Sequence, residues 1–471
     1  MRRRVSMGRA YTASSSAVKV SRRVGVLALA GLTLALAEPA HAGNGRSYEL
    51  GNDAAIMGGT GVARSVDGAA AWYNPAGLAA IERYQLDVSG SAFMLRFRKY
   101  PSIMEATDGV TTRSVGISDT EFVAVPTSLV FARRVLPKLV LGFGLFVPEM
   151  AEVSSQDGFD DLPVQGGSFG MQLDFASKVR SFHVGFALGG ELGGRVRLGL
   201  GLFGVYRKTQ SRVRLLENNR PTSPATPETS AAFIVFEDDD NRSVIGGLFT
   251  VGAQWEFIKG WHLGVTVRSP LWQFGQFGDR TTVNSGAQTT DRQLPPASFT
   301  LSKDNLRKTG GGTVLPVEIH VAVAAEFPGG YVALEADFMP PVENEELSVD
   351  SRFAWNVRAG VRYQFTERFA AGLGLFTDRT TAPPAAVLGD EHVDYYGVTL
   401  GGEYRKPIQL GSREEAKTLV FSTTFGVRYA FGLGQFGAYK IDLARPNASP
   451  DVVRDAVLHE LSLHLGSTLL F

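Results

Sequence analysis

Apolar and polar residues alternate along most of the chain after Tyr84. From Val357 to Thr366, apolar residues occupy every second position, while Arg, Gly, Arg, Gln and Thr occupy the positions between them. The same pattern holds in residues 261–268 and 317–327. Because successive side chains of a β-strand point to opposite faces, a period of two predicts strands with one apolar and one polar face.

Fourteen runs of this kind can be delimited, and many extend over 10 to 16 residues. They are Tyr84–Arg98, Ser118–Arg134, Leu139–Glu149, Ser177–Glu191, Arg195–Leu215, Ser243–Phe257, Trp261–Phe274, Thr313–Phe327, Tyr331–Phe338, Phe353–Phe365, Arg368–Thr377, His392–Arg405, Lys417–Phe431 and Val457–Phe471. Strands of soluble proteins average about 5–6 residues. An even number of long strands predicts an all-β fold: a 14-stranded antiparallel transmembrane β-barrel with a polar lumen. A soluble β-sandwich, which also alternates, is the less favoured alternative.

Short and long connections alternate between these strands. Tight turns are expected at 258–260, 328–330 and 366–367, and long segments at 216–242, 275–312 and 432–456. Short periplasmic turns and long outer loops are typical of bacterial barrels. The connection 407–416 is longer than the other turns of its set.

The final strand alternates up to the last residue, Phe471. An alternating strand that ends on Phe resembles the C-terminal signal of outer-membrane barrels. The resemblance implies that Phe471 is recognised by the barrel-assembly machinery.

The N-terminus has the features of a secretory signal. Seven basic residues precede an apolar run from Val24 to Ala37, and Ala40-His41-Ala42 has small residues at both recognition positions of a signal peptidase. We therefore expect residues 1–42 to be a signal peptide, translated from Met1 or Met7. A transmembrane anchor is the alternative, although 14 apolar residues are few for a span.

Composition narrows the class of protein further. The chain has 54 Gly, 30 Phe and no Cys, so it has no disulfide framework and no thiolate metal site. Without residues 1–42, which hold seven basic residues and one acidic residue, 40 basic and 46 acidic residues give a net charge of −6. That balance is not typical of nucleic-acid binding. No later segment has 18 consecutive apolar residues, and a closed barrel is the other structure that satisfies its backbone in lipid.

Residues 43–83 precede the first strand and show little alternation. Within them, Asn52–Ala55 and Val66–Ala79 resemble the N-terminal hatch of the FadL/TodX-like outer-membrane transporters for long-chain fatty acids and aromatic hydrocarbons. Asn74-Pro75-Ala76-Gly77-Leu78 is the most specific part. Softer matches follow in family order at Leu141–Gly144, Val147-Pro148, Val267–Pro270, Leu315-Pro316 and Val393–Val398.

The resemblance implies a hatch or plug at 43–83 inside a barrel formed by 84–471. It also implies capture of a hydrophobic ligand by outer loops, passage gated by the hatch, and lateral release through the wall. The segment 216–242 is rich in polar residues and Pro, with one apolar patch at 231–236, which departs from a greasy capture surface.

Three sets of residues are candidates for function. Asn74, Pro75, Ala76, Gly77 and Leu78 either form a structural turn or line the ligand path. Lumen-facing Arg358 and Arg268 either pair with acids such as Glu335 and Asp337 or bind a ligand carboxylate. Gly142 and Gly144 either are tolerated within the third strand or mark a kink that opens the wall.

Enzyme chemistry finds little support. His residues are scattered, and neither G-x-S-x-G nor H-E-x-x-H occurs. We expect no enzyme activity, no metal and no cofactor. The partners we expect are a hydrophobic small molecule and outer-membrane lipid, with the protein a monomer in the outer membrane. The leading hypothesis is a passive channel for hydrophobic molecules. The alternatives are a structural or surface-interaction barrel with a permanent plug, and a barrel hydrolase acting on lipids.

Overall fold

The computed structural model is an all-β protein, and it describes most of the chain from Glu49 to Phe471. The described residues are 49–65, 67–82, 84–164, 167–221, 232–288, 298–344, 349–386, 388, 390–410, 417–443 and 451–471. The expected signal peptide at 1–42 and the first residues of the expected hatch lie outside them. Within the described residues, no helix is long and apolar enough to cross a membrane.

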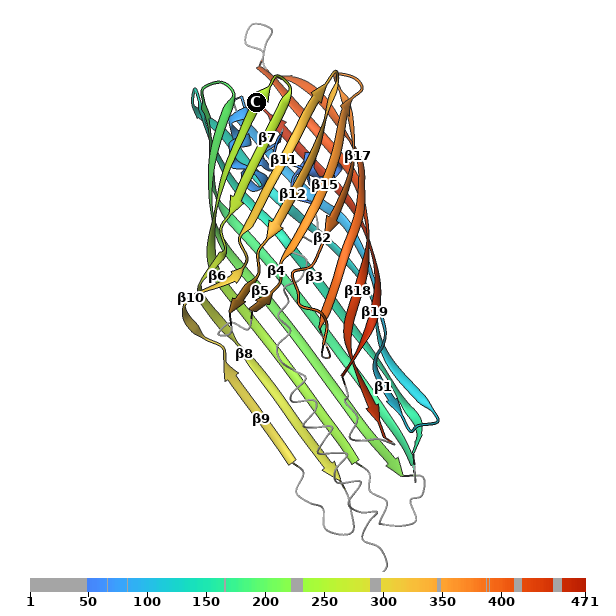
Figure 1. Cartoon of the computed structure of the whole chain (residues 1–471). Helices are drawn as coiled ribbons and strands as arrows, with labels where there is room; N and C mark the ends of the chain where they lie inside the picture. The colour runs from blue at the N-terminus through green and yellow to red at the C-terminus, as the bar shows by residue number, and fades with distance from the viewer. Residues whose placement is uncertain are drawn as a thin grey trace, which may run out of the picture.

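Long strands make up the wall, and three short helices precede them (Figure 1). The helices are α2 (Asn52–Ile56), α3 (Ala70–Tyr73) and the 3₁₀ helix η1 (Pro75–Ala80). The strands are β1 (Tyr84–Thr107), β2 (Thr112–Leu136), β3 (Leu139–Val164), β4 (Gly167–Leu192), β5 (Val196–Pro221), β6 (Ala232–Ile258), β7 (Trp261–Arg268), β8 (Leu271–Gln288), β9 (Ser298–Asn305), β10 (Lys308–Leu315), β11 (Glu318–Phe327), β12 (Gly330–Met339), β13 (Val342–Asn344), β14 (Val349–Ser351), β15 (Ala354–Gln364), β16 (Phe369–Asp378), β17 (Glu391–Leu410), β18 (Lys417–Asp442) and β19 (Asp451–Leu470).

The wall closes on itself. Antiparallel pairs lead from β1 through β6 to β7, then through β11, β12 and β15 to β19, and β19 pairs with β1. At the closing seam, Tyr84 and Phe471 exchange two backbone hydrogen bonds of 3.1 Å, and their rings stack at 5.3 Å. Over Met104–Thr107, β1 also pairs with β18 in parallel. Each strand of this ring is paired on both sides over at least part of its length.

The main sheet contains 17 strands, against the 14 expected from sequence. Two of the expected strands are each divided at a proline: β7 and β8 are separated by Ser269-Pro270, and β10 and β11 by Pro316-Val317. A proline lacks the N–H that the ladder needs, so pairing stops there. The third additional strand is β9, which pairs with β8.

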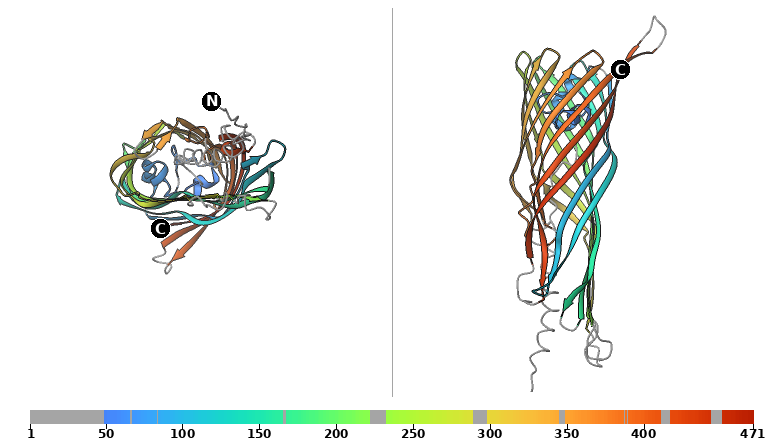
Figure 2. Two further views of the ribbon diagram at one scale, coloured as in Figure 1. Left: turned by 90° about the horizontal axis from the view of Figure 1, so that it is seen from below. Right: turned by 90° about the vertical axis from the view of Figure 1, so that its right-hand side faces the viewer.

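The strands are longer than alternation indicated. Strands β1 to β6 have 24 to 27 residues each, so much of the expected loop sequence at 216–242, 275–312 and 432–456 continues the strands. The apolar patch near Phe236 belongs to β6. At the opposite end of the molecule, β17 and β18 stay paired as far as Leu410 and Lys417, so their hairpin extends past the ring (Figure 2).

The segment from Glu49 to Glu82, here called the inner segment, lies inside the ring near the end with the short turns (Figures 1 and 2). Nearly all of its described residues are buried, including the whole of α2 and α3. Together with wall residues such as Phe146, Phe203 and Tyr331 it forms one buried apolar cluster.

Candidate functional site

A belt of wall glycines faces the inner segment. A Cβ atom added at Gly199 would lie 2.1 Å from the amide N of Ala76, and at Gly252 it would lie 2.0 Å from Oδ1 of Asn74. An atom of the inner segment would also lie within 3.3 Å of a Cβ added at each of the following glycines: Gly142, Gly189, Gly264, Gly360, Gly372, Gly374, Gly401, Gly426 and Gly466. The belt lets the backbone of the inner segment approach the backbone of the wall on most sides.

Asn74 fastens the start of η1 to the wall. Its side chain is 0% exposed, and its Nδ2 donates to the carbonyl oxygens of Val62 at 2.8 Å and Ala253 at 3.0 Å. Its Oδ1 accepts from the amide of Ala76 at 3.1 Å and so caps η1. Pro75, Ala76, Gly77 and Leu78 are also buried. Asn74–Leu78 therefore dock the inner segment, and their place on a ligand path stays a prediction.

Carboxylates tie other parts of the inner segment to the wall. Asp53 forms an ion pair with Arg362 at 2.9 Å and accepts a hydrogen bond from Tyr331. The amides of Gly61 and Val62 donate to Oε2 of Glu335 at 3.1 and 3.2 Å. These contacts satisfy backbone groups that the irregular inner segment cannot pair within itself.

Asp67 organises the inner segment internally. Its Oδ2 accepts from the amides of Asn52 and Asp53 at 2.9 Å each, and its Oδ1 accepts from the amide of Ala69 at 3.1 Å. Burial, followed by the nearby carboxylates of Asp87 and Asp53, raises the pKa of Asp67 to about 7, against the two amides that lower it.

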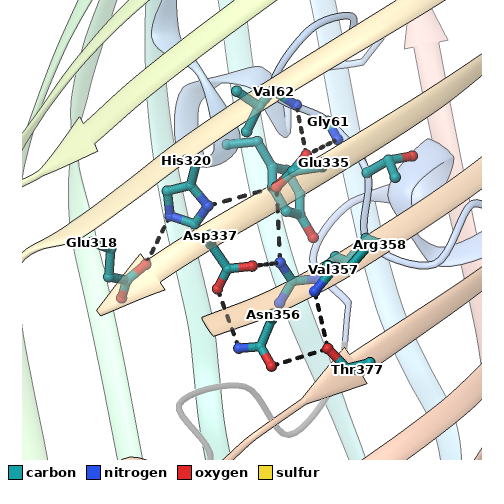
Figure 3. Close-up of polar contacts among 12 residues, drawn as sticks. Gly61, Val62, Glu318, His320, Glu335, Asp337, Asn356, Val357, Arg358 and Thr377 are labelled. Carbon is teal, nitrogen blue, oxygen red and sulfur yellow. Dashed lines mark hydrogen bonds and ion pairs between the residues drawn. The ribbon is translucent and has the colours of Figure 1, made fainter. Parts of the chain in front are cut away.

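Arg358 lies at the centre of a buried polar cluster on β11, β12 and β15 (Figure 3). Its guanidinium pairs with Asp337 and lies 3.9 Å from Glu335. His320 connects Glu335 to Glu318 through contacts of 3.6 and 3.1 Å. Arg358 thus pairs with carboxylates of the protein, which is the first of the two alternatives given above for this residue.

Arg268 is engaged in the same way. Its Nη1 pairs with Glu318 at 2.6 Å, its Nη2 donates to the carbonyl of Trp72 at 2.9 Å, and its guanidinium lies 4.1 Å from the Trp72 ring centroid. Arg268 therefore anchors α3. Binding of a ligand carboxylate by Arg268 or Arg358 stays a prediction, and it would require displacement of these partners. Arg195, the first residue of the expected strand Arg195–Leu215, lies in an exposed turn.

The outer half of the barrel interior has a different character. A second buried apolar cluster lies there, towards the end opposite the short turns. Its larger members are Tyr100, Ile103, Met104, Ile117, Leu162, Phe169, Met171, Leu173, Leu215, Phe236, Phe376, Tyr395, Phe436, Tyr439 and Leu458. The rings of Tyr100 and Phe436 meet edge to face at 5.1 Å. The alternation of apolar and polar residues had predicted a polar lumen, so this apolar lining is a finding of the structure.

The junction of β2 with β3 is incomplete. Their backbone pairing extends from Leu136–Leu139 to Ser128–Phe146, and in the described part of the chain no β2–β3 pair lies beyond it. Bonds between a side chain and the backbone reach across this gap. The amide of Glu152 donates to the Glu121 carboxylate of β2 at 2.8 Å, and Nη1 of Arg98, on β1, donates to the carbonyl of Glu152 at 2.8 Å. We call this region the β2–β3 seam.

Comparison with known proteins identifies the architecture. No family model matches the sequence, and no curated protein matches it. A FadL homologue from Pseudomonas aeruginosa matches with a TM-score of 0.59 and 13% identity, covering 90% of this chain and 99% of its own. The chain has the FadL-like fold.

Two further structures agree with this fold. The toluene transporter TodX of Pseudomonas putida has a TM-score of 0.54 and 12% identity, covering 91% of this chain and 99% of its own. The monoaromatic hydrocarbon channel CymD has a TM-score of 0.51 and 12% identity, covering 90% and 98%. The resemblance inferred from the sequence is thus confirmed at the level of the fold, which fits an outer-membrane barrel.

Within this fold, the pairing of β3 with β4 is regular at Gly142 and Gly144 and becomes irregular beyond them. Gly142 pairs with Ala132 and Ala187, and Gly144 pairs with Val130 and Gly185, so both lie in a regular ladder. The irregularity lies between Phe146 and Glu149, where Pro148 has no N–H to donate. Gly142 instead makes room for Leu78, and Gly144 makes room for the Phe146 ring.

The glycine belt and the seam residues were missed at the level of sequence. One signal for the belt was present, because Gly360 lies on the same strand face as Arg358 and Arg362, which is the inward face. The seam gave no comparable signal, since nothing in the alternation of β2 marks where pairing with β3 ends.

Proposed function

We propose that this protein is an outer-membrane channel for the passive uptake of hydrophobic small molecules, either long-chain fatty acids or aromatic hydrocarbons. The observation that carries the proposal is the buried apolar lining of the outer half of the barrel interior. A polar lumen would favour water and ions, whereas apolar side chains favour a desolvated apolar ligand. Proteins of the same fold are named as toluene and monoaromatic hydrocarbon channels.

The proposed barrel has 14 membrane spans, with β7 and β8 forming one span and β10 and β11 another. Residues 1–42 are removed as a signal peptide, 43–83 form the hatch, and 84–471 form the barrel. The protein acts as a monomer after insertion by the barrel-assembly machinery, which recognises Phe471.

The proposed path bends sideways. A ligand enters at the outer end and moves among the apolar side chains, and the inner segment blocks the straight route to the periplasm. Because that segment is docked backbone to backbone against wall glycines, moving it as a unit would break many buried hydrogen bonds at once. We therefore infer lateral release through the β2–β3 seam, where the described residues show no backbone pairing between the two strands and contacts involve side chains.

Uptake by proteoliposomes that contain the full-length protein tests the proposal. Oleate and toluene are added outside, and the initial rate of entry is measured with an entrapped reporter. Leu173→Asn places an amide in the apolar cluster and should lower the rate by about tenfold, the equivalent of about 1.4 kcal/mol. Gln172→Asn, on the exposed face of the same strand, should leave the rate within about twofold.

The alternative is a sealed barrel whose loops bind an outside partner, and the close docking of the inner segment is the observation that favours it. A sealed barrel would give the uptake rate of empty liposomes for both ligands. That result, with a barrel that migrates as folded on unheated gels, would reject the channel.

A further inference from the structure

The outer surface of β4 and β5 carries a band of exposed apolar side chains. Phe186 is 58% exposed on β4, and Leu202 is 65% exposed on β5. The other members of the band on these two strands are Val184, Leu188, Leu198 and Leu200. Since these residues alternate with buried ones, they face outwards, towards lipid.

Two aromatic residues mark the outer edge of this band. Phe182 on β4 and Tyr206 on β5 are directly opposite each other in the ladder. Both lie on the same outward strand face as the apolar band. Aromatic side chains concentrate where the hydrocarbon core meets the headgroups, because their rings are apolar and their edges polar. The next outward positions therefore lie at the level of the lipid headgroups.

Those next positions are basic. Arg180 is directly opposite Lys208, and Lys178 follows Arg180 on the same face of β4. Lys178 and Arg180 are 30% and 39% exposed, so they are accessible from outside. We call these three residues the basic triad.

The basic triad is only partly neutralised. Glu152 on β3 is its one acidic neighbour in the described ion pairs, at 2.6 Å from Nζ of Lys178 and 3.8 Å from Nη2 of Arg180. Three cations and one carboxylate leave a net charge of +2. The described part of the chain gives Lys208 no ion pair.

We propose that the basic triad binds the phosphate group of an outer-leaflet lipid. The partly exposed side chains of one arginine and two lysines can hold a phosphate through charge-assisted hydrogen bonds. The acyl chains of the same lipid would lie along the apolar band below, so one molecule would satisfy both features. Glu152 competes with the phosphate for Lys178 and Arg180. This inference does not depend on what the channel carries.

Native mass spectrometry of the full-length protein in detergent micelles tests this site. The probe is diphosphorylated lipid A, compared with its dephosphorylated form and with inorganic phosphate. The triple variant Lys178→Gln, Arg180→Gln, Lys208→Gln should bind diphosphorylated lipid A at least about tenfold more weakly. Glu152→Gln should bind it a few times more tightly, because the competing carboxylate is gone.

The matched control is Arg212→Gln, which removes a basic residue further out on β5 that lies 3.7 Å from Asp174. Its affinity should stay within about twofold of the unmodified protein. Equal affinity of the triple variant and the unmodified protein would overturn the proposal. So would displacement of lipid A by inorganic phosphate, or equal binding of the dephosphorylated lipid. All variants must first migrate as folded barrels before heating.

Discussion

The two halves of the barrel interior are filled in opposite ways. Near the short turns, the inner segment meets the wall through glycines, backbone amides and buried ion pairs. In the outer half, Phe, Tyr, Leu and Met side chains of the wall pack against one another. One continuous ladder supports both halves, because inward positions can change from glycine to large apolar residues without changing the backbone. The backbone of the wall is therefore the same in both halves, and the size of the inward side chains decides what occupies the lumen.

Removal of the inner segment is the strongest way to break this comparison. Deletion of Asn52–Ala80 takes away all three helices and leaves β1 to β19 intact. We expect a low-conductance barrel to become a wide aqueous pore, with single-channel conductance increased at least about tenfold in planar bilayers. Equal conductance of the two proteins would mean that the inner segment does not block the lumen.

A smaller perturbation targets the docking itself. Gly199→Val would place side-chain atoms where Ala76 lies, since even a Cβ atom would be 2.1 Å from its amide N. We expect η1 to be displaced, so that trypsin cleaves at Arg64 several times faster in the folded protein. Gly204→Val on the outward face of β5, where the nearest atom is 3.8 Å away, should cleave like the unmodified protein.

Buried ion pairs of the inner half should contribute to the stability of the barrel, whereas exposed ion pairs at the outer end should not. Arg362→Met leaves Asp53 and Glu403 without their shared cation, and breaking a buried pair in this way costs about 3–5 kcal/mol. The midpoint of thermal unfolding, followed by gel migration, should fall clearly. Arg113→Met removes an exposed outer pair with Asp161 and should leave the midpoint unchanged. Similar midpoints for both variants would contradict the comparison.

The smallest expected effect is a dependence of the docking of the inner segment on pH. Asp67 belongs to the inner segment, and its folded-state pKa of about 7 lies above the ordinary value of 3.8. A raised carboxyl pKa means that docking is most stable when Asp67 is neutral. This contribution is complete below about pH 4 and is lost as the pH rises through 7. Cleavage at Arg64 should therefore accelerate between pH 5 and 8, and Asp67→Asn should flatten that change.

Much of the wall could be predicted from the sequence. Alternation located the membrane-crossing parts of the strands and placed Arg268, Arg358 and Arg362 inside, because a charge facing lipid would be costly. Strand length was underestimated, because the outer parts of some strands do not alternate apolar and polar residues. The acidic run 237–240 in β6, for example, has no alternation and still pairs with β5 and β8.

The site could be predicted only in outline. The family resemblance implied a hatch at 43–83, but hydrogen bonds such as that of Asn74 to Ala253 join positions far apart in the chain. Likewise, the end of β2–β3 pairing depends on how two strands diverge in space. Gly142 and Gly144 were candidates for a kink in β3, whereas the irregular pairing of β3 with β4 lies at Pro148.

The pairing of Tyr84 with Phe471 has a consequence for how the chain acquires its structure. The first and last residues of the wall exchange both of their backbone hydrogen bonds, although nearly the whole barrel sequence separates them. No order of synthesis or export can complete that contact early, and contacts between distant residues form slowly. Each preceding hairpin must therefore be kept from pairing with the wrong edge until the final residue arrives. The time for which that edge stays open is set by the export of the last strand.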